Sequence, residues 1–316
     1  MSLAGKGAGA AARPDDESRL LQLVYYAYRA GSGAAQALPE RFVYGTAHTL
    51  GTLAARRSKR RPLVTRNLAR VTGLDETSPE LAAMVDDAYR SYARYWLETF
   101  RLVKETPEFF LDRVHVKNGE NLRAGESRGK GTVAVVSHLG NYDAAGAWAA
   151  SWGLDLVTIA EVLRPRRMFD FFVEHRSKLG MRIHPSQTGA TDVLADEARG
   201  GAVVAIVGDR DLKQRGPIVD FFGEPAHLPA GPAIVAVKSG APIVVAGVFS
   251  RESADGKHGW YVEMGEPFDV ASGADAVEVT TQRIARELES HIKRSPQEWQ
   301  AVFQRFWIAD RSRSTQ

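Results

Sequence analysis

The second half of the chain alternates short apolar runs with amphipathic stretches. Four runs are rich in β-branched residues and show no polar–apolar alternation: TVAVVS (132–137), LDLVTIA (154–160), GAVVAIVGD (201–209) and APIVVAGVF (241–249). Such runs are typical of strands buried on both faces of a sheet. IVAVKSG (234–240) has a similar composition, although it overlaps a stretch with helical spacing. HGWYVEMGEPFD (258–269) predicts an edge strand.

Helical patterns separate these runs. They cover residues 143–152, 166–180, 188–199, 229–240 and 273–293, and a segment at 296–307 follows them. Alternation of strands and helices is typical of a sheet with helices packed on its faces. The pattern therefore predicts an α/β fold with a mostly parallel or mixed central sheet flanked by helices.

The first third of the chain has a different pattern, because it carries helical spacing throughout. Residues 19–55 predict amphipathic helices with a Gly/Ser break at 31–33, and Pro39 suits a first helical turn. Two more helices are expected at 63–73 and 79–103. The last of these carries an aromatic stripe at three- and four-residue spacing: Tyr89, Tyr92, Tyr95, Trp96 and Phe100. We expect an N-terminal amphipathic helical portion.

These patterns predict a single domain at 19–310, with a flexible tail at 1–18 and a short tail at 311–316. Within it we expect a helical, membrane-facing portion at 19–103 and an α/β catalytic core at 104–310. We find no internal repeat and no low-complexity linker that would divide the chain.

Charge is distributed unevenly. The net charge of the 316 residues is only +3, and there are no cysteines, which excludes disulfides, thiolate metal sites and cysteine nucleophiles. Residues 41–70 contain no acidic residue. They contain eight basic residues: Arg41, Arg56, Arg57, Lys59, Arg60, Arg61, Arg66 and Arg70. Such a cluster suits an anionic membrane surface. Nucleic acid is a weaker alternative, because no nucleic-acid motif accompanies the cluster.

Membrane contact is expected to be peripheral. No apolar stretch reaches the 18 or more residues that a spanning helix needs, and the N-terminus lacks the apolar run of a signal peptide. We therefore expect the protein on the cytoplasmic face of the cell (inner) membrane, with the amphipathic helices at 19–55 in contact with lipid.

One candidate site follows the run at 132–137. His138 comes directly after it, and Asp143 lies five positions later, where the next helix is expected to begin. An imidazole and a carboxylate in an H-x-x-x-x-D pattern can pair, and the imidazole can then accept a proton from a substrate hydroxyl. The alternative is structural, with His138 ending a strand and Asp143 capping a helix.

Two further charged clusters follow apolar runs. Glu161 and Arg164 follow the run at 154–160, while Asp209, Arg210 and Asp211 follow residues 201–208. Ligands bind beyond the carboxyl ends of strands in open α/β sheets, so we expect the clusters to converge on one sheet edge. A metal site formed by Asp143, Asp209, Asp211 and His138 is the competing use of these residues. We expect no metal, because Arg210 offsets the charge of the two aspartates beside it.

Six segments follow one another along the chain: SHLGNYDAAG, AEVLRP, FFVEHRSKLGM, VGDRDL, VDFFGEPAHLPAGPAIVAVKSGAPIVV and PQEWQAVFQRFW. This ordered series resembles the bacterial lipid A biosynthesis acyltransferase superfamily, and within it the actinobacterial branch that acylates phosphatidylinositol mannosides. The resemblance extends from about residue 20 to 310. It is far more specific than the histidine–aspartate motif alone.

The resemblance implies a transfer reaction and its participants. The donor would be acyl-CoA, typically palmitoyl-CoA, acting as a co-substrate without any cofactor. The acceptor would be the 6-hydroxyl of the mannose on inositol position 2 of phosphatidylinositol mono- or dimannoside. His138 would be the general base with Asp143 as its partner. Substrate-binding roles would belong to Glu161, Arg164, Arg176, Asp209, Arg210 and Asp211.

One position departs from the family pattern. Asp209 stands where the family pattern has a glutamate, in an E-R-D-L version of the segment, which keeps the charge but shortens the reach toward the sugar. Arg164 and Arg176 match basic positions, and one of them would bind the oxyanion or a phosphate.

Three other functions remain open on the sequence. The acceptor could be another glycolipid or a lipid A-type saccharide, or water could replace it in an acyl-CoA thioesterase. A lipid-binding protein without catalysis would use the basic helices alone.

Overall fold

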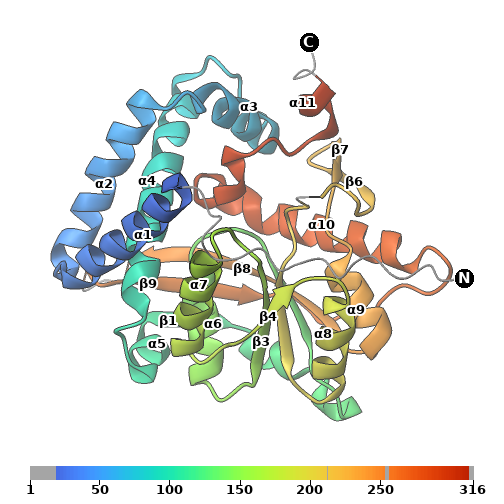
Figure 1. The fold of residues 1–316 in the computed structure, drawn as a ribbon. Coiled ribbons are helices and arrows are strands. Elements are labelled where there is room, and N and C mark those ends of the chain that lie inside the picture. Colours follow the sequence, from blue (N-terminus) through green and yellow to red (C-terminus); the bar gives the residue numbers. More distant parts are fainter. Residues whose placement is uncertain (1–18, 212, 253–255, 313–316) are drawn as a thin grey trace, which may run out of the picture.

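The computed structural model describes residues 19–211, 213–252 and 256–312. Its centre is a seven-stranded sheet in the order β1-β9-β8-β2-β5-β3-β4 (Figure 1). The strands are β1 (Val114–Lys117), β2 (Val133–Val136), β3 (Leu156–Glu161), β4 (Arg182–Ser186), β5 (Val203–Val207), β8 (Ile243–Glu252) and β9 (His258–Met264). Five of the six neighbouring pairs are parallel, and only β8–β9 is antiparallel. The predicted, mostly parallel sheet is confirmed.

Two expectations about this sheet were wrong. The alternating segment around β9 is an inner strand, because β1 pairs with its other side. A strand alternates between more and less buried residues when one face of the sheet is less deeply covered, and this can occur in an inner strand as well as in an edge strand. Residues of the run at 234–240 form helix α9 (Gly231–Ser239), so helical spacing prevailed over β-branched composition there.

Helices cover both faces of the sheet. They are α5 (Pro107–Arg113), α6 (Tyr142–Ser151), α7 (Arg166–Lys178), α8 (Ala190–Arg199), α9 and α10 (Ala276–Arg294). Successive side chains of β2 point to opposite faces. Val133 and Val135 belong to the same core cluster as Leu194 of α8. Ala134 belongs to a second cluster with Trp148 of α6. Every buried strand therefore contributes to two cores, which explains its continuous apolar sequence.

Four helices form the N-terminal portion: α1 (Arg19–Ala37), α2 (Glu40–Arg57), α3 (Arg61–Thr72) and α4 (Pro79–Leu102). They gather on one side of the molecule, beside β8 and β9 (Figure 1). Helix α4 is amphipathic, begins with a Ser78 cap and buries one face. The break predicted at 31–33 was wrong, since α1 continues through it. Ser32 and Ala35 are buried, and the small residues permit close packing of this part of α1.

Several short elements lie outside the central sheet and its covering helices, among them a β-hairpin and the C-terminal segments. Strands β6 (Ile218–Phe221) and β7 (Glu224–His227) form a separate antiparallel pair. After α10 the chain turns through two 3-10 segments, η4 (Pro296–Glu298) and η5 (Gln300–Phe303), into α11 (Ile308–Ser312). The tail expected at 1–18 lies outside the described residues. The tail expected at 311–316 also lies outside them, except for the last two positions of α11.

Candidate active site

His138 and Asp209 meet because their strands are neighbours in register. In the parallel pair β2–β5, Val136 lies beside Val207, and each site residue follows two positions later. His138 Nδ1 lies 2.6 Å from Asp209 Oδ1, and the His138 backbone N–H donates to Asp209 Oδ2 at 3.0 Å. An ionised carboxylate can only accept, so Nδ1 carries the hydrogen. The Nε2 nitrogen is then the basic nitrogen of the ring.

Asp209 lies in an environment that keeps it ionised. Its side chain is fully buried, and Trp299 Nε1 donates to its Oδ2 at 2.7 Å. Burial by itself would raise the pKa of Asp209, but the interactions with His138 and the Trp299 indole outweigh it, and the pKa lies below its usual value. A buried carboxylate of this kind fixes the imidazole tautomer and stabilises an imidazolium. His138 itself is partly exposed, with 23% of its side chain accessible.

Asp143 is not the residue that holds the imidazole. It lies in the first turn of α6, and the helix directs it toward α4 and α7. Its Oδ1 accepts from Arg176 Nε at 2.7 Å, and its Oδ2 lies 3.4 Å from the Tyr95 hydroxyl oxygen. The expected His138–Asp143 pair is therefore replaced by two pairs, His138–Asp209 and Arg176–Asp143. Residue spacing alone did not distinguish the two carboxylates.

The Arg176–Asp143 pair belongs to a buried network beside the histidine. The Tyr95 hydroxyl donates to that of Tyr142 at 2.6 Å, and the Tyr142 ring meets His138 edge-on at 5.7 Å between centroids. Burial raises the pKa of Tyr142 to about 12, with the charge of Asp143 adding to the effect. For Arg176, burial is outweighed by Asp143, and the guanidinium pKa lies above its usual value. The network contacts His138 through the Tyr142 ring.

The remaining predicted residues divide between the rim and the loops. Glu161 ends β3 and is exposed, and its carboxylate lies 3.8 Å from the guanidinium of Arg210. Arg164 is exposed just before α7. Asp211 accepts backbone N–H groups of Lys213, Arg215 and Gly216, so it organises its own loop. The prediction that these clusters converge on one sheet edge is met by His138, Asp209, Glu161 and Arg210.

Residue-by-residue reasoning missed the contribution of the 298–300 segment. Leu139 forms a β-bridge with Trp299, and the Gln300 N–H donates to the His138 carbonyl at 2.7 Å. The segment belongs to the PQEW motif, whose position about 160 residues downstream of the histidine gave no sign of contact. The only available signal was a tryptophan and two polar residues in a motif that carried the family resemblance.

An aromatic cluster spans three helices. Tyr28 of α1 lies edge-on to Trp96 of α4 and to Phe172 of α7, at 5.4 and 6.0 Å between centroids. Trp96 also contacts Phe172 and Phe100. Aromatic side chains of α1, α4 and α7 therefore form one cluster.

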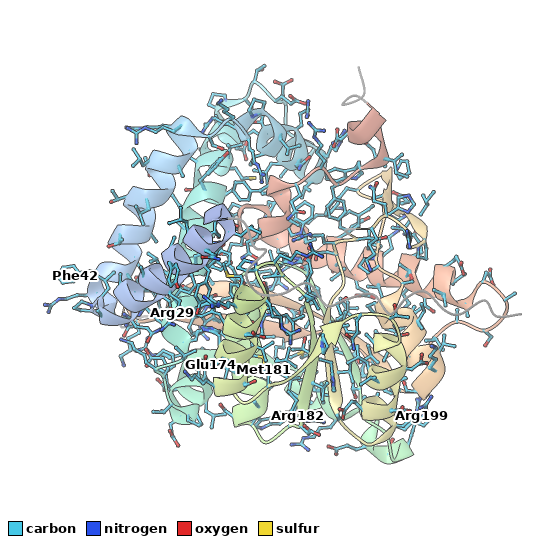
Figure 2. The ribbon with its side chains drawn as sticks, viewed as in Figure 1. Arg29, Phe42, Glu174, Met181, Arg182 and Arg199 are labelled. Atoms are coloured by element: carbon cyan, nitrogen blue, oxygen red, sulfur yellow. The ribbon has the colours of Figure 1, made fainter. Side chains whose placement is uncertain are left out.

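The basic run at 41–70 divides into internal and outward-facing residues. Arg70 pairs with Asp310 at 2.6 Å and with Glu224 at 2.8 Å. Arg61 pairs with Asp86. Five others are exposed on or just after α2: Arg41, Arg56, Arg57, Lys59 and Arg60. The same helix exposes large apolar side chains, including Phe42, which is 49% accessible and lies on the outer side of α2 (Figure 2).

Within residues 19–211, 213–252 and 256–312, no group of three or more His, Asp or Glu side chains is arranged to hold a metal ion. In the same ranges, none of the helices combines the length and the apolar character needed to cross a bilayer.

An acyltransferase class follows from comparison of the whole chain with known families. The family model of bacterial lipid A biosynthesis acyltransferases matches residues 13–307, and the chain belongs to this family. It is 34% identical over 302 residues to a phosphatidylinositol mannoside acyltransferase of Mycobacterium tuberculosis (strain H37Rv), covering 92% of this chain and 90% of that protein. A protein of the same name from Mycolicibacterium smegmatis is 33% identical over 298 residues, covering 92% and 93%.

Proposed function

We propose that this chain transfers a fatty acyl group from acyl-CoA to the mannose 6-hydroxyl on inositol position 2 of a phosphatidylinositol mannoside. The observation that carries the proposal is the His138–Asp209 dyad at the carboxyl edge of the sheet, with Nδ1 held by a buried carboxylate. The names and the identities of the relatives support the acceptor.

The reaction needs one base and no covalent enzyme intermediate. His138 Nε2 takes the proton of the sugar hydroxyl as its oxygen attacks the thioester carbonyl. The tetrahedral intermediate then collapses, the C–S bond breaks, and the imidazolium returns the proton to the departing CoA thiolate. Asp209 stabilises the transient imidazolium, and a positioned base of this type contributes about 10²–10⁴ in rate. In this mechanism the dyad partner is Asp209, so this residue makes no contact with the sugar.

Exposed polar groups at the rim suit recognition of the polar acceptor. Glu161 and Arg210 supply an acceptor and donors for sugar hydroxyls near the dyad. Arg164 suits an anionic group of either substrate better than Arg176 does, because Arg164 is exposed whereas Arg176 is committed to Asp143.

The acyl chain requires an apolar environment. Each methylene left in water costs about 0.8 kcal/mol, so a long chain must be covered during transfer. The aromatic cluster of Tyr28, Trp96, Phe100 and Phe172 is the best supported lining.

Helix α2 suits peripheral docking on an anionic membrane, on the cytoplasmic face of the inner membrane. It exposes Phe42, Leu50 and Leu53 next to Arg56 and Arg57. Each basic residue near an anionic surface adds about 1 kcal/mol of attraction. Docking by this face brings the enzyme to an acceptor that stays in the bilayer.

Acyl transfer can be tested with purified protein, labelled palmitoyl-CoA and a panel of acceptors: phosphatidylinositol dimannoside, a lipid A-type saccharide and none. A parallel series with acyl carrier protein as the acyl donor tests the choice of donor. We expect transfer to the mannoside from CoA, lost in His138→Ala with an unchanged circular dichroism spectrum. Equal release of free fatty acid without acceptor would indicate a thioesterase instead, and full turnover by His138→Ala would refute the mechanism.

A further inference from the structure

The loop that carries His138 is held by a buried charged cluster that the acyl-transfer chemistry does not use. Glu98 on α4 is buried, and its Oε2 accepts from Asn141 Nδ2 and from Trp260 Nε1, both at 3.1 Å. Its Oε1 lies 3.7 Å from Arg94 Nε. Arg94 Nη2 in turn lies 3.2 Å from Glu298 Oε1. The Arg94 guanidinium therefore lies between the carboxylates of Glu98 and Glu298.

Glu98 reaches the loop through Asn141. The Asn141 side chain caps α6, because its Oδ1 accepts from the Ala144 N–H at 3.2 Å, while its amide donates to Glu98. This arrangement fixes both ends of the Asn141 side chain. A capping side chain whose amide is also hydrogen-bonded has one defined orientation. The start of α6 is thereby tied to α4.

Glu298 holds the other side of the loop. Its Oε2 accepts from the Ser250 N–H at 2.8 Å and from the Ser250 hydroxyl at 3.0 Å. Its backbone carbonyl accepts from the Gly140 N–H at 3.2 Å, and Gln300 Nε2 donates to the Gly140 carbonyl at 2.6 Å. Gly140 has φ of +58°, and a Cβ there would lie 2.3 Å from the Val248 carbonyl oxygen, so the loop follows one narrow path.

The electrostatics of the cluster favour a positioning role over a simple packing role. Burial raises the pKa of the Glu98 carboxyl above its usual value, although Arg94 and the two N–H donors oppose this effect. An apolar residue would fill the same space without this desolvation. The described contacts of the cluster lead to residues 140 and 141 and to strands β8 and β9, and none reaches the imidazole.

We propose that Glu98, anchored by Arg94 and Glu298, is a positioning residue that sets the His138–Asn141 loop and thereby the direction of the His138 imidazole. This inference rests on the proposed function for its kinetic consequence. Misplacement of a reacting group by about 1 Å costs up to about 100-fold in rate. We therefore expect Glu98→Ala to lower kcat about 10- to 100-fold with little change in KM.

The variant series separates positioning from stability. Glu98→Gln retains a carbonyl oxygen that accepts from Asn141 and Trp260, so we expect it to recover most of kcat. Glu98→Asp keeps the charge but shortens the reach, and we expect an intermediate kcat if Glu98→Ala does not fold. The matched control is Glu289→Ala, because Glu289 is equally buried and accepts from the Phe222 N–H instead of from Asn141 and Trp260. It should lower the melting temperature without lowering kcat.

A second readout needs no substrate and so tests the inference even if the proposed function fails. The imidazole NMR signals of His138, assigned by their absence from His138→Gln, should shift or broaden in Glu98→Ala. Those of His184, which is bonded to Glu197, should not change. Unchanged His138 signals would overturn the inference, as would equal losses of kcat in Glu98→Ala and Glu289→Ala. Absence of transfer by the unmodified protein, with shifted His138 signals in the variant, would refute the function alone.

Discussion

Substitution of Asp209 by asparagine tests the central claim that this residue, and not Asp143, activates His138. The two side chains have nearly the same shape. The asparagine carbonyl can still accept from the His138 N–H and from Trp299 Nε1, which both bond to Oδ2 of the aspartate. The asparagine amide would then face His138 Nδ1, where a carboxylate oxygen now lies at 2.6 Å. Two donors cannot pair, so the imidazole must change tautomer and place its hydrogen on Nε2.

The expected loss follows from the removal of the base. Loss of a positioned general base lowers kcat about 10²–10⁴-fold, or about 3–5 kcal/mol in transition-state free energy. KM should stay within about threefold, because Asp209 is fully buried and touches no substrate. The melting temperature should change little, since two of the three hydrogen bonds persist.

The assay is steady-state acyl transfer with palmitoyl-CoA and phosphatidylinositol dimannoside, and the matched control is Asp310→Asn. Asp310 is also a buried aspartate, and its carboxylate pairs with Arg70 instead of with a histidine. We expect the control to lower the melting temperature and leave kcat intact. A kcat for Asp209→Asn within threefold of the unmodified protein would refute the dyad. Full loss in Asp143→Asn together with an active Asp209→Asn would restore the pair expected from spacing.

Two further predictions concern the exposed apolar residues of α2 and the buried side chain of His291. Phe42→Ser combined with Leu53→Ser removes two half-exposed apolar side chains of α2. The double variant should bind anionic vesicles about 2 kcal/mol more weakly, or about 30-fold in sedimentation assays. Unchanged binding would exclude this face of α2 as the membrane-docking surface. Burial, aided by the charge of Arg294, lowers the pKa of His291, so the folded protein resists protonation that the unfolded chain accepts. The free energy of unfolding should therefore fall as the pH drops below about 6.5, by at most about 1.4 kcal/mol per pH unit for this histidine. In denaturation series, His291→Gln should show a shallower decline, and an identical slope would contradict the assignment.

Much of the core could be predicted because continuous apolar runs in the sequence indicate strands that are buried on both faces. Runs such as 132–137 and 201–209 are apolar on both faces, and they formed β2 and β5 as expected. Their ends also contained the dyad. His138 and Asp209 each follow their strand by two residues, and a correct strand order would have placed them side by side. The H-x-x-x-x-D spacing drew attention to Asp143 instead, because strand order is not encoded in local pattern.

Contacts between distant segments could not be predicted in this way. Trp299 lies 90 residues from Asp209 in sequence, and Glu98 lies 43 residues from Asn141. Nothing in the local pattern of α4 marks Glu98 as inward-facing, since acidic residues in amphipathic helices are usually solvated. The continuity of α1 through its glycines was missed for a related reason, because packing against other elements overrode a weak local preference.

The length of the acidic side chain at position 209 matches the strand register. Asp209 is placed by β5 directly beside His138, and a short carboxylate reaches Nδ1, the His138 backbone N–H and the Trp299 indole together. A glutamate at this position would need its additional methylene accommodated within a site that is already fully buried. The indole of Trp299, carried by the 298–300 segment, donates to the same carboxylate oxygen as the His138 backbone N–H. The length of the acidic side chain and the position of this segment are therefore coupled, and a substitution at one is expected to require an adjustment at the other.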